Sequence, residues 1–227
     1  MKLKENYEEF KKIIEERKIT DLIHFTPTKN LYGIFEQGEI MSRARLEKLD
    51  VKLFDILDYI QFTDDIRLDD KNYINLSLSI PNTYLFSKFK EKTKHDPTIT
   101  WCILKIDPKH IYEEGTLFAV TNAASNAAKR QFGISGDIEK FKQLFLPEIQ
   151  IDTYNGPRII KRGNIKDKYP TDVQAEILVK DSIPLNSIKQ VCFFNHEDLA
   201  KTKAALKEFN TEKFVVDTQI FNPNRYL

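Results

Sequence analysis

Hydrophobic residues recur along the chain at two spacings, which predicts helices and strands in one fold. Residues 74–80, INLSLSI, alternate between apolar and polar side chains, as in a strand with one face on a core. Residues 7–18 place Phe10, Ile13 and Ile14 at helical spacing among Glu and Lys, which predicts an amphipathic helix. Because the two patterns follow one another without a regular βαβ rhythm, the sequence favours the α+β class over a doubly wound sheet.

The same patterns predict the remaining elements. Further strands are expected at residues 22–25, 100–106, 173–179, 190–194 and 213–217. Further helices are expected at residues 31–37, 45–57, 122–131, 137–145 and 196–209. The first of these helices is followed by Gly38, the residue type that most often ends a helix.

A long segment, residues 147–172, follows neither spacing, and long irregular segments of compact domains are usually functional or disordered. It holds a cluster of cations flanked by tyrosines: Tyr154, Arg158, Lys161, Arg162, Lys166, Lys168 and Tyr169. Cations mixed with aromatic rings suit single-stranded nucleic acid, through phosphate contacts and base stacking. A solvated loop is the alternative interpretation.

The composition is that of an ordinary globular protein and restricts the possible functions. Of 227 residues, 35 are Lys or Arg and 34 are Asp or Glu, which argues against a nucleic-acid coat over the whole surface but allows a local basic groove. The length favours one domain over residues 1–227. Two cysteines without a CxxC pair, no long apolar run and no secretory signal predict a cytoplasmic protein without a metal site.

The first candidate for chemistry is the segment that begins at His24. On a strand His24 and Thr26 share a face, so an imidazole and a hydroxyl can bind the hydroxyls of a ribose together. The helix start that follows offers free N–H groups to phosphate or amide groups. The alternative is a helix cap beside a histidine that is already hydrogen-bonded. The sequence has no Gly-rich phosphate loop of the Rossmann or P-loop type.

Two further candidates for chemistry are polar or charged side chains that lie next to apolar residues in the sequence. Gln174 and Glu176 are expected on the same face of the strand 173–179, where a partly desolvated carboxylate needs a partner. The solvent face of an edge strand is the alternative. Arg67 lies among aspartates before the strand 74–80, where it forms either a surface ion-pair cluster or a clamp for pyrophosphate.

Together these segments resemble the DarT toxins, NAD-dependent ADP-ribosyltransferases that modify DNA bases. HFTPTKNLYGI is similar to the family's HxT…NL..I segment, and QAEILV followed by SIPLNSI is similar to its QAEFLV…VPW..I segment. The resemblance covers residues 20–195 in the family's order. It departs from the family where Asn122 replaces a histidine and Leu185 replaces a tryptophan, and Asn122 with SLSIPN resembles the guanine-modifying branch more than the thymine-modifying one.

The resemblance implies an ADP-ribosyltransferase fold, a split mixed β-sheet with flanking helices and with NAD+ in its cleft. It implies these roles: Glu176 and Arg67 catalytic; His24, Thr26, Asn30, Gly33 and Gln174 in the NAD site; Asn122, Tyr154, Arg158, Lys161 and Arg162 in contact with DNA. It further implies NAD+ as co-substrate without a metal, single-stranded DNA as acceptor, and a macrodomain antitoxin that reverses the modification. The protein itself is expected to be a monomer.

Three other functions stay open on the sequence alone. An ADP-ribosyltransferase could act on RNA or protein in place of DNA. A binding module could hold the nucleotide without chemistry, and a structural protein would not bind NAD+ at all. The basic segment with its two tyrosines favours nucleic acid as the acceptor.

Overall fold

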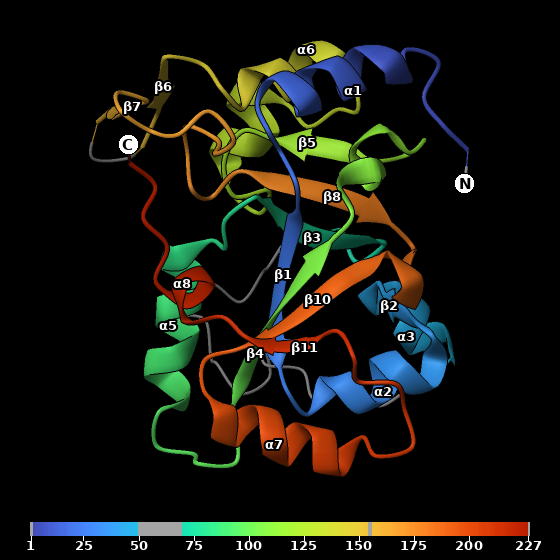
Figure 1. Ribbon diagram of the computed structural model, residues 1–227. Coiled ribbons are helices and arrows are strands. Elements are labelled where there is room, and N and C mark those ends of the chain that lie inside the picture. Colours follow the sequence, from blue (N-terminus) through green and yellow to red (C-terminus); the bar gives the residue numbers. More distant parts are fainter. Residues whose placement is uncertain (1, 50–69, 154–155, 227) are drawn as a thin grey trace.

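The computed structural model describes residues 2–49, 70–153 and 156–226. Within these residues a mixed sheet of seven strands has the order β11-β10-β4-β1-β3-β8-β5 (Figure 1). Its strands are β1 Leu22–Pro27, β3 Tyr73–Leu78, β4 Trp101–Ile106, β5 Leu117–Ala119, β8 Glu176–Lys180, β10 Ile188–Phe193 and β11 Phe214–Val216. All neighbours are antiparallel except β10 and β11, so the predicted α+β class is confirmed.

Helices and two small sheets surround this sheet. The helices are α1 Tyr7–Glu16, α2 Asn30–Gln37, α3 Arg43–Leu49, α5 Thr83–Thr93, α6 Ile138–Gln143, α7 His196–Ala205 and α8 Thr218–Phe221. Two 3₁₀ turns, η1 Pro108–Tyr112 and η3 Leu185–Ser187, and one π-helix, η2 Ala127–Phe132, complete the helical elements of the described residues. The small sheets pair β2 Glu39–Met41 with β9 Ser182–Pro184 and β6 Glu148–Ile151 with β7 Arg158–Lys161.

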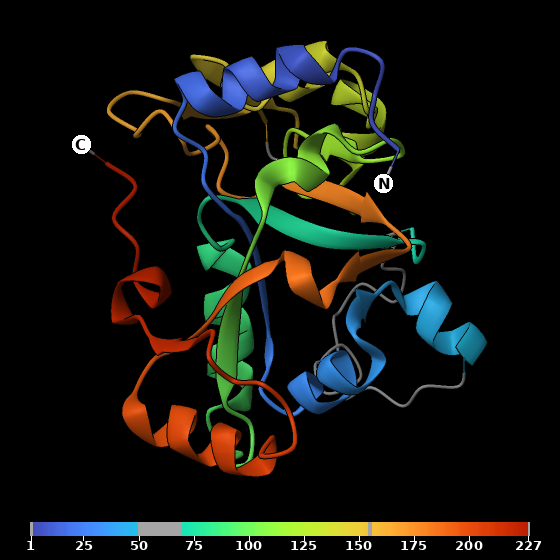
Figure 2. The same cartoon turned by 45° about the vertical axis from the view of Figure 1, so that its right-hand side comes forward.

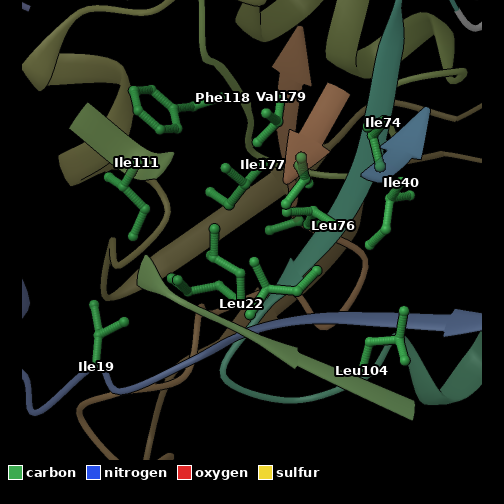
Figure 3. Packing of buried hydrophobic residues seen from close by; sticks show 14 of the residues in the cluster. Ile19, Leu22, Ile40, Ile74, Leu76, Leu104, Ile111, Phe118, Ile177 and Val179 are labelled. Atoms are coloured by element: carbon green, nitrogen blue, oxygen red, sulfur yellow. The ribbon is translucent and has the colours of Figure 1, made fainter. Parts of the chain in front are cut away.

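The helices cover the two faces of the sheet unequally. Helices α1, α2 and α6 share one apolar core with alternate residues of the strands, among them Leu22, Leu76 and Ile177 (Figure 3). Helices α5 and α8 pack on the other face, against Ile23 and Ile103 of β1 and β4. Figures 1 and 2 show α1 beside α6 at one end of the molecule and α2 with α7 at the other.

The sheet separates between β1 and β3. The ladder between β1 and β4 runs from Leu22 to Pro27, whereas the ladder between β1 and β3 holds only the pairs of Leu22 with Leu78 and Ile23 with Ser77. Among the residues that the structure describes, residues 24–27 of β1 therefore have no ladder partner on the β3 side. This separation agrees with the split sheet that the resemblance implies, and it lies beside the motif that begins at His24.

Most predicted elements are confirmed, and the exceptions have local causes. The strand expected at 173–179 begins only at Glu176, because Asp172 caps a turn: its Oδ1 accepts from Gln174 N at 3.0 Å. The helix expected at 122–131 is a turn followed by a π-helix. Helix α5 is absent from the prediction, although Asn82 caps it by accepting from Leu85 N at 3.0 Å. Most of the helix expected at 45–57 lies outside the described residues.

Candidate active site

Glu176 is the first residue of β8 and lies in the interior of the large sheet. Its direct partners across the two neighbouring ladders are Ser77 of β3 and Ala119 of β5, and Ser77 in turn faces Ile23 of β1. Direct partners in antiparallel ladders share a face, so these four side chains form one row across the sheet. The Glu176 side chain is 5% exposed. The alternative of a solvent-facing edge strand is therefore wrong for this acid.

Two donors hold one oxygen of Glu176. The backbone N–H of Ala123 donates to Oε2 over 2.8 Å, and the side-chain amide of Asn75 donates to the same atom over 3.3 Å. Donors from a loop after β5 and from β3 meet on this atom, so they fix the plane of the carboxylate. Hydrogen bonds of this kind offset the cost of burying a charged group.

The loop that supplies the Ala123 N–H is shaped by Asn122. Its side-chain Oδ1 accepts from Ala124 N at 2.9 Å, and its backbone oxygen accepts from Ser125 N at 2.9 Å. Such side-chain turns compete with helix formation, which explains why the predicted helix does not start here. Asn122 is thus adjacent in sequence to the backbone group that binds Glu176.

His24 reaches the same part of the sheet from β1. Its Nδ1 lies 3.4 Å from the backbone oxygen of Asn75, and because a carbonyl can only accept, Nδ1 carries the proton. Burial lowers the pKa of His24 below its ordinary value of 6.5, although the bond to Asn75 opposes the shift. The imidazole is therefore neutral at pH 7, with Nε2 as a hydrogen-bond acceptor. His24 and Glu176 contact one common residue, which brings the first and last motifs together.

Thr26 and Asn30 form a buried polar pair beside His24. The Asn30 side-chain amide donates to Thr26 Oγ1 over 3.0 Å, between the end of β1 and the first residue of α2. The two residues are 5% and 9% exposed. Since the Thr26 hydroxyl accepts this bond, its own proton can be donated to another acceptor.

Gly33 lies within α2 and borders open space. A Cβ atom built on Gly33 has no heavy atom of the described residues outside its own helix turn within 4 Å. Glycine in a helix interior costs stability relative to alanine, and no side chain in the described part of the chain requires it here. The site leaves room for a ligand to approach the backbone of α2 closely.

The predicted DNA-contacting residues have different surroundings. Arg158 and Lys161 are exposed on β7, and Lys161 lies 3.8 Å from Glu148 on the paired strand β6. Tyr154 lies outside the described residues, as does the catalytic candidate Arg67. Arg158 and Lys161 are thus the exposed cations of this hairpin that can meet a phosphate.

The guanidinium group of Arg162 is hydrogen-bonded to the loop that follows it in the chain. Its Nη1 donates to Tyr169 O at 2.8 Å and to Thr171 Oγ1 at 3.4 Å. Its Nη2 donates to Lys166 O at 3.0 Å and to Asp167 O at 3.1 Å. These four bonds tie the loop that leads to Glu176, so Arg162 holds the loop together.

The hairpin is joined to the π-helix by Gln131. Its side-chain amide donates to Gln150 O at 2.9 Å, and its Oε1 accepts from Asp152 N at 3.1 Å. One side chain therefore binds the backbone of β6 and of the residue that follows it. Roles for Gln131, Asn75 and the Ala123 N–H were not predicted from the sequence. Asn75 carries a signal in retrospect, because it is a polar residue on the same strand face as Ser77.

The described residues hold no metal-binding group. No three His, Cys, Asp or Glu side chains in this part of the chain lie together as a cation would need. None of the helices observed in it is long and apolar enough to cross a membrane.

Comparisons with known proteins agree with this geometry. The sequence profile described as "ssDNA thymidine ADP-ribosyltransferase, DarT" matches residues 23–226. No curated protein sequence matches the chain. DarT of Thermus sp. 2.9, solved with carba-NAD⁺, superposes with a TM-score of 0.58 at 14% identity over 90% of this chain and 98% of the other. The same Thermus DarT solved with ADP-ribosylated ssDNA gives the same score and identity over 90% and 97%.

A third similar structure is a longer chain. DarTG of Thermosipho africanus, solved with ADP-ribose, has a TM-score of 0.57 at 19% identity. The match covers 89% of this chain and 51% of the other, so this chain spans about half the length of that relative. The fold is therefore that of the DarT ADP-ribosyltransferases, as the resemblance implied. The profile match over most of the sequence shows that the chain belongs to the DarT family of ssDNA thymidine ADP-ribosyltransferases.

Proposed function

We propose that the protein transfers ADP-ribose from NAD⁺ to a base of single-stranded DNA and that Glu176 is its catalytic carboxylate. The observation that carries this proposal is the buried acid held by Ala123 N–H and Asn75 beside the separation of β1 from β3. Membership of the DarT family supports it. The Thermus relative was solved with NAD⁺ and with ADP-ribosylated ssDNA, which supports both the donor and the acceptor.

The reaction exchanges one bond of the nicotinamide ribose. The bond between C1′ and the nicotinamide nitrogen breaks, and its electron pair leaves with neutral nicotinamide. The sugar passes through an oxocarbenium-like state, after which a base nitrogen forms the new bond to C1′ and releases a proton. Glu176 stabilises the positive sugar and anchors a ribose hydroxyl. Electrostatic stabilisation of this kind is worth about 3–4 kcal/mol.

The NAD site is assigned to residues around the end of β1. His24 Nε2 accepts a hydrogen bond from a ribose hydroxyl and Thr26 donates one to the same sugar, while Asn30 fixes the Thr26 hydroxyl. Gly33 lets the dinucleotide approach α2, and Gln174 closes the site from the turn before Glu176. These side chains suit the hydroxyl and amide groups of NAD⁺. The described residues contain no group of His, Cys, Asp or Glu side chains that could hold a metal ion.

Arg67 keeps the role that the family resemblance implies. Its planar guanidinium suits both the pyrophosphate and the attacking base. Because it lies outside the described residues, the assignment is tested by substitution. In Arg67→Lys the charge is kept and the fork of donors is lost, so nicotinamide release falls.

The acceptor DNA is assigned to the side of Asn122 and the β6–β7 hairpin. Arg158, Lys161 and Tyr154 contact the strand by charge and stacking, and Asn122 faces the base. A single strand offers an unstacked base without the few kcal/mol that extrusion from a duplex costs.

The acceptor base is assigned as guanine. Support comes from Asn122 and from the segment SLSIPN, which resemble the guanine-modifying branch, although the family description names thymidine. Short oligonucleotides that each offer one base type are incubated with NAD⁺ and analysed by mass spectrometry. A gain of one ADP-ribose on the guanine oligonucleotide is expected. Modification of the thymine oligonucleotide alone would overturn the assignment of guanine and leave the transferase activity in place.

Parallel reactions with RNA and with protein acceptors test the acceptor class, because modification of either in place of DNA overturns the assignment of DNA as the acceptor.

The proposed partner is a macrodomain antitoxin that removes the ADP-ribose. The similar Thermosipho africanus structure is a DarTG in complex with ADP-ribose, which supports such a pairing. Release of the modification by an added macrodomain is expected, and persistence of the adduct contradicts the pairing.

A further inference from the structure

Asn75 occupies a position where an asparagine needs an explanation. It lies in the middle of β3 between buried Ile74 and Leu76, and Asn is disfavoured in strands. Its Cα partner on β8 is Leu178, which offers no polar group from its side chain. Packing and strand propensity therefore do not account for an amide at this place.

The side-chain amide of Asn75 contacts Glu176, which lies on β8 two residues before the direct partner of Asn75. Its Nδ2 donates to Glu176 Oε2 over 3.3 Å, and the same oxygen accepts from Ala123 N over 2.8 Å. A backbone N–H and an amide from opposite sides restrict rotation of the carboxylate about its last bond. Charge-assisted bonds of this type are stronger than bonds between neutral groups.

The backbone of Asn75 serves the other motif. His24 Nδ1 contacts the Asn75 carbonyl oxygen at 3.4 Å. This bond uses the main chain, so it survives any change of the Asn75 side chain. The two contacts of Asn75 can thus be separated by substitution: the side chain acts on Glu176 and the backbone acts on His24.

We propose that Asn75 is a positioning residue that holds the Glu176 carboxylate in the orientation needed to stabilise the sugar cation. The inference rests on the proposed function and names a residue that the family resemblance does not assign. It predicts a larger effect on the chemical step than on NAD⁺ binding. The reason is that the Asn75 amide touches the acid, whereas the other residues assigned to NAD⁺ binding are on β1 and α2 and in the turn before Glu176.

Two substitutions separate donation from space filling. Asn75→Ala removes both the donor and the volume. Asn75→Leu nearly keeps the volume and removes the donor without adding a charge beside Glu176. If Asn75 only filled space, Leu would retain activity and Ala would lose it. If Asn75 acts by donating, Leu loses activity as Ala does.

The matched control is Asn72→Ala. Asn72 lies three positions earlier in the chain, is exposed, and donates from its side chain to Asp70 Oδ1 at 2.7 Å. It has no contact with Glu176, so its loss leaves the acid in place. Thermal unfolding of every variant confirms that it folds, and Asn75→Leu still decides the matter if Asn75→Ala does not fold.

Steady-state nicotinamide release and transfer to DNA are measured against NAD⁺ concentration. Loss of a bond to a charged group predicts that kcat falls about 10- to 100-fold in Asn75→Ala, with KM for NAD⁺ within about twofold of wild type. Asn75→Leu falls about as far, and Asn72→Ala matches wild type. Wild-type kcat in Asn75→Ala, or in Asn75→Leu, overturns the inference.

The outcomes also distinguish this inference from the proposed function. A wild-type protein that neither releases nicotinamide nor modifies DNA overturns the function and the inference with it. An active wild type, an inactive Glu176→Gln and an undiminished Asn75→Ala overturn only the positioning role of Asn75.

Discussion

The backbone N–H of Ala123 donates to Oε2 of Glu176 over 2.8 Å, so the loop that carries Asn122 is tied directly to the acid. The side chain of Asn122 shapes that loop by accepting from Ala124 N. The same residue is the candidate for reading the base. The proposed contact with the acceptor base and the support of the carboxylate therefore belong to the same turn.

Asn122→Asp and Asn122→Ala are expected to have different effects. Aspartate keeps an oxygen that accepts from Ala124 N but replaces the amide donor with a charged oxygen, so the turn and nicotinamide release without DNA are kept while transfer to DNA falls. Alanine loses the turn as well, so both activities fall. Nicotinamide release with and without oligonucleotide measures this difference. Equal loss of both activities in Asn122→Asp would contradict a role in base recognition.

Gly33→Ala is expected to act in opposite directions on stability and on binding. Among the described residues outside its own helix turn, the added Cβ meets no atom within 4 Å, so the helix gains about 0.5–1 kcal/mol from the better helix former. If NAD⁺ lies against α2, the same methyl group hinders it and KM for NAD⁺ rises. Chemical unfolding and a titration of NAD⁺ test the two effects. A stabilised variant with unchanged affinity removes Gly33 from the NAD site.

His24 makes stability depend on pH on the acid side. Because burial lowers its pKa in the folded state below the ordinary 6.5, the unfolded chain binds the proton more readily. The stability from the neutral ring is present above pH 6.5 and is lost as the pH falls through the lowered value. Melting curves between pH 8 and 5 are expected to show a steeper loss in wild type than in His24→Gln. Identical slopes would show that His24 does not titrate in this way.

We expect Arg162 to contribute to the stability of the fold, and the exposed cations of β7, Arg158 and Lys161, to contribute to DNA binding. Arg162→Ala removes four bonds to the loop before Glu176 and destabilises the fold by about 2–3 kcal/mol. Arg158→Ala and Lys161→Ala leave stability unchanged and weaken DNA binding, with a smaller salt dependence, because each removes a phosphate contact. Denaturant unfolding and DNA affinity at two salt concentrations separate the two groups. A stable Arg162→Ala with weakened DNA binding reverses the assignment.

The sequence predicted the parts of the fold that depend on periodicity. The strand around Leu76 and the helix around Phe10 were predictable because each places apolar residues at a regular spacing on the main core. The strand around Leu104 was predictable as a short apolar run, which is buried on both faces. The position of Glu176 in the sheet was not, because the order of β3, β8 and β5 depends on pairings distant in sequence. The start of β8 was also missed, since the cap by Asp172 overrides the strand pattern.

The sequence motifs predicted which residues belong to the candidate site but not which of them contact one another. The sequence indicated His24 and Glu176, but only the structure shows that Asn75 contacts both. A cluster of cations suggested equal roles for Arg158, Lys161 and Arg162. The carbonyl oxygens around Arg162 distinguish it from the other two, and a loop without periodicity gives no sign of them in advance.

The central claim is tested most directly by Glu176→Gln, which keeps the size of the side chain and removes its charge. Mass spectrometry follows the gain of ADP-ribose on a single-stranded oligonucleotide, and calorimetry follows NAD⁺ binding. A folded variant that still binds NAD⁺ and modifies DNA at least about 100-fold more slowly than wild type is expected. Undiminished modification by Glu176→Gln would contradict the account.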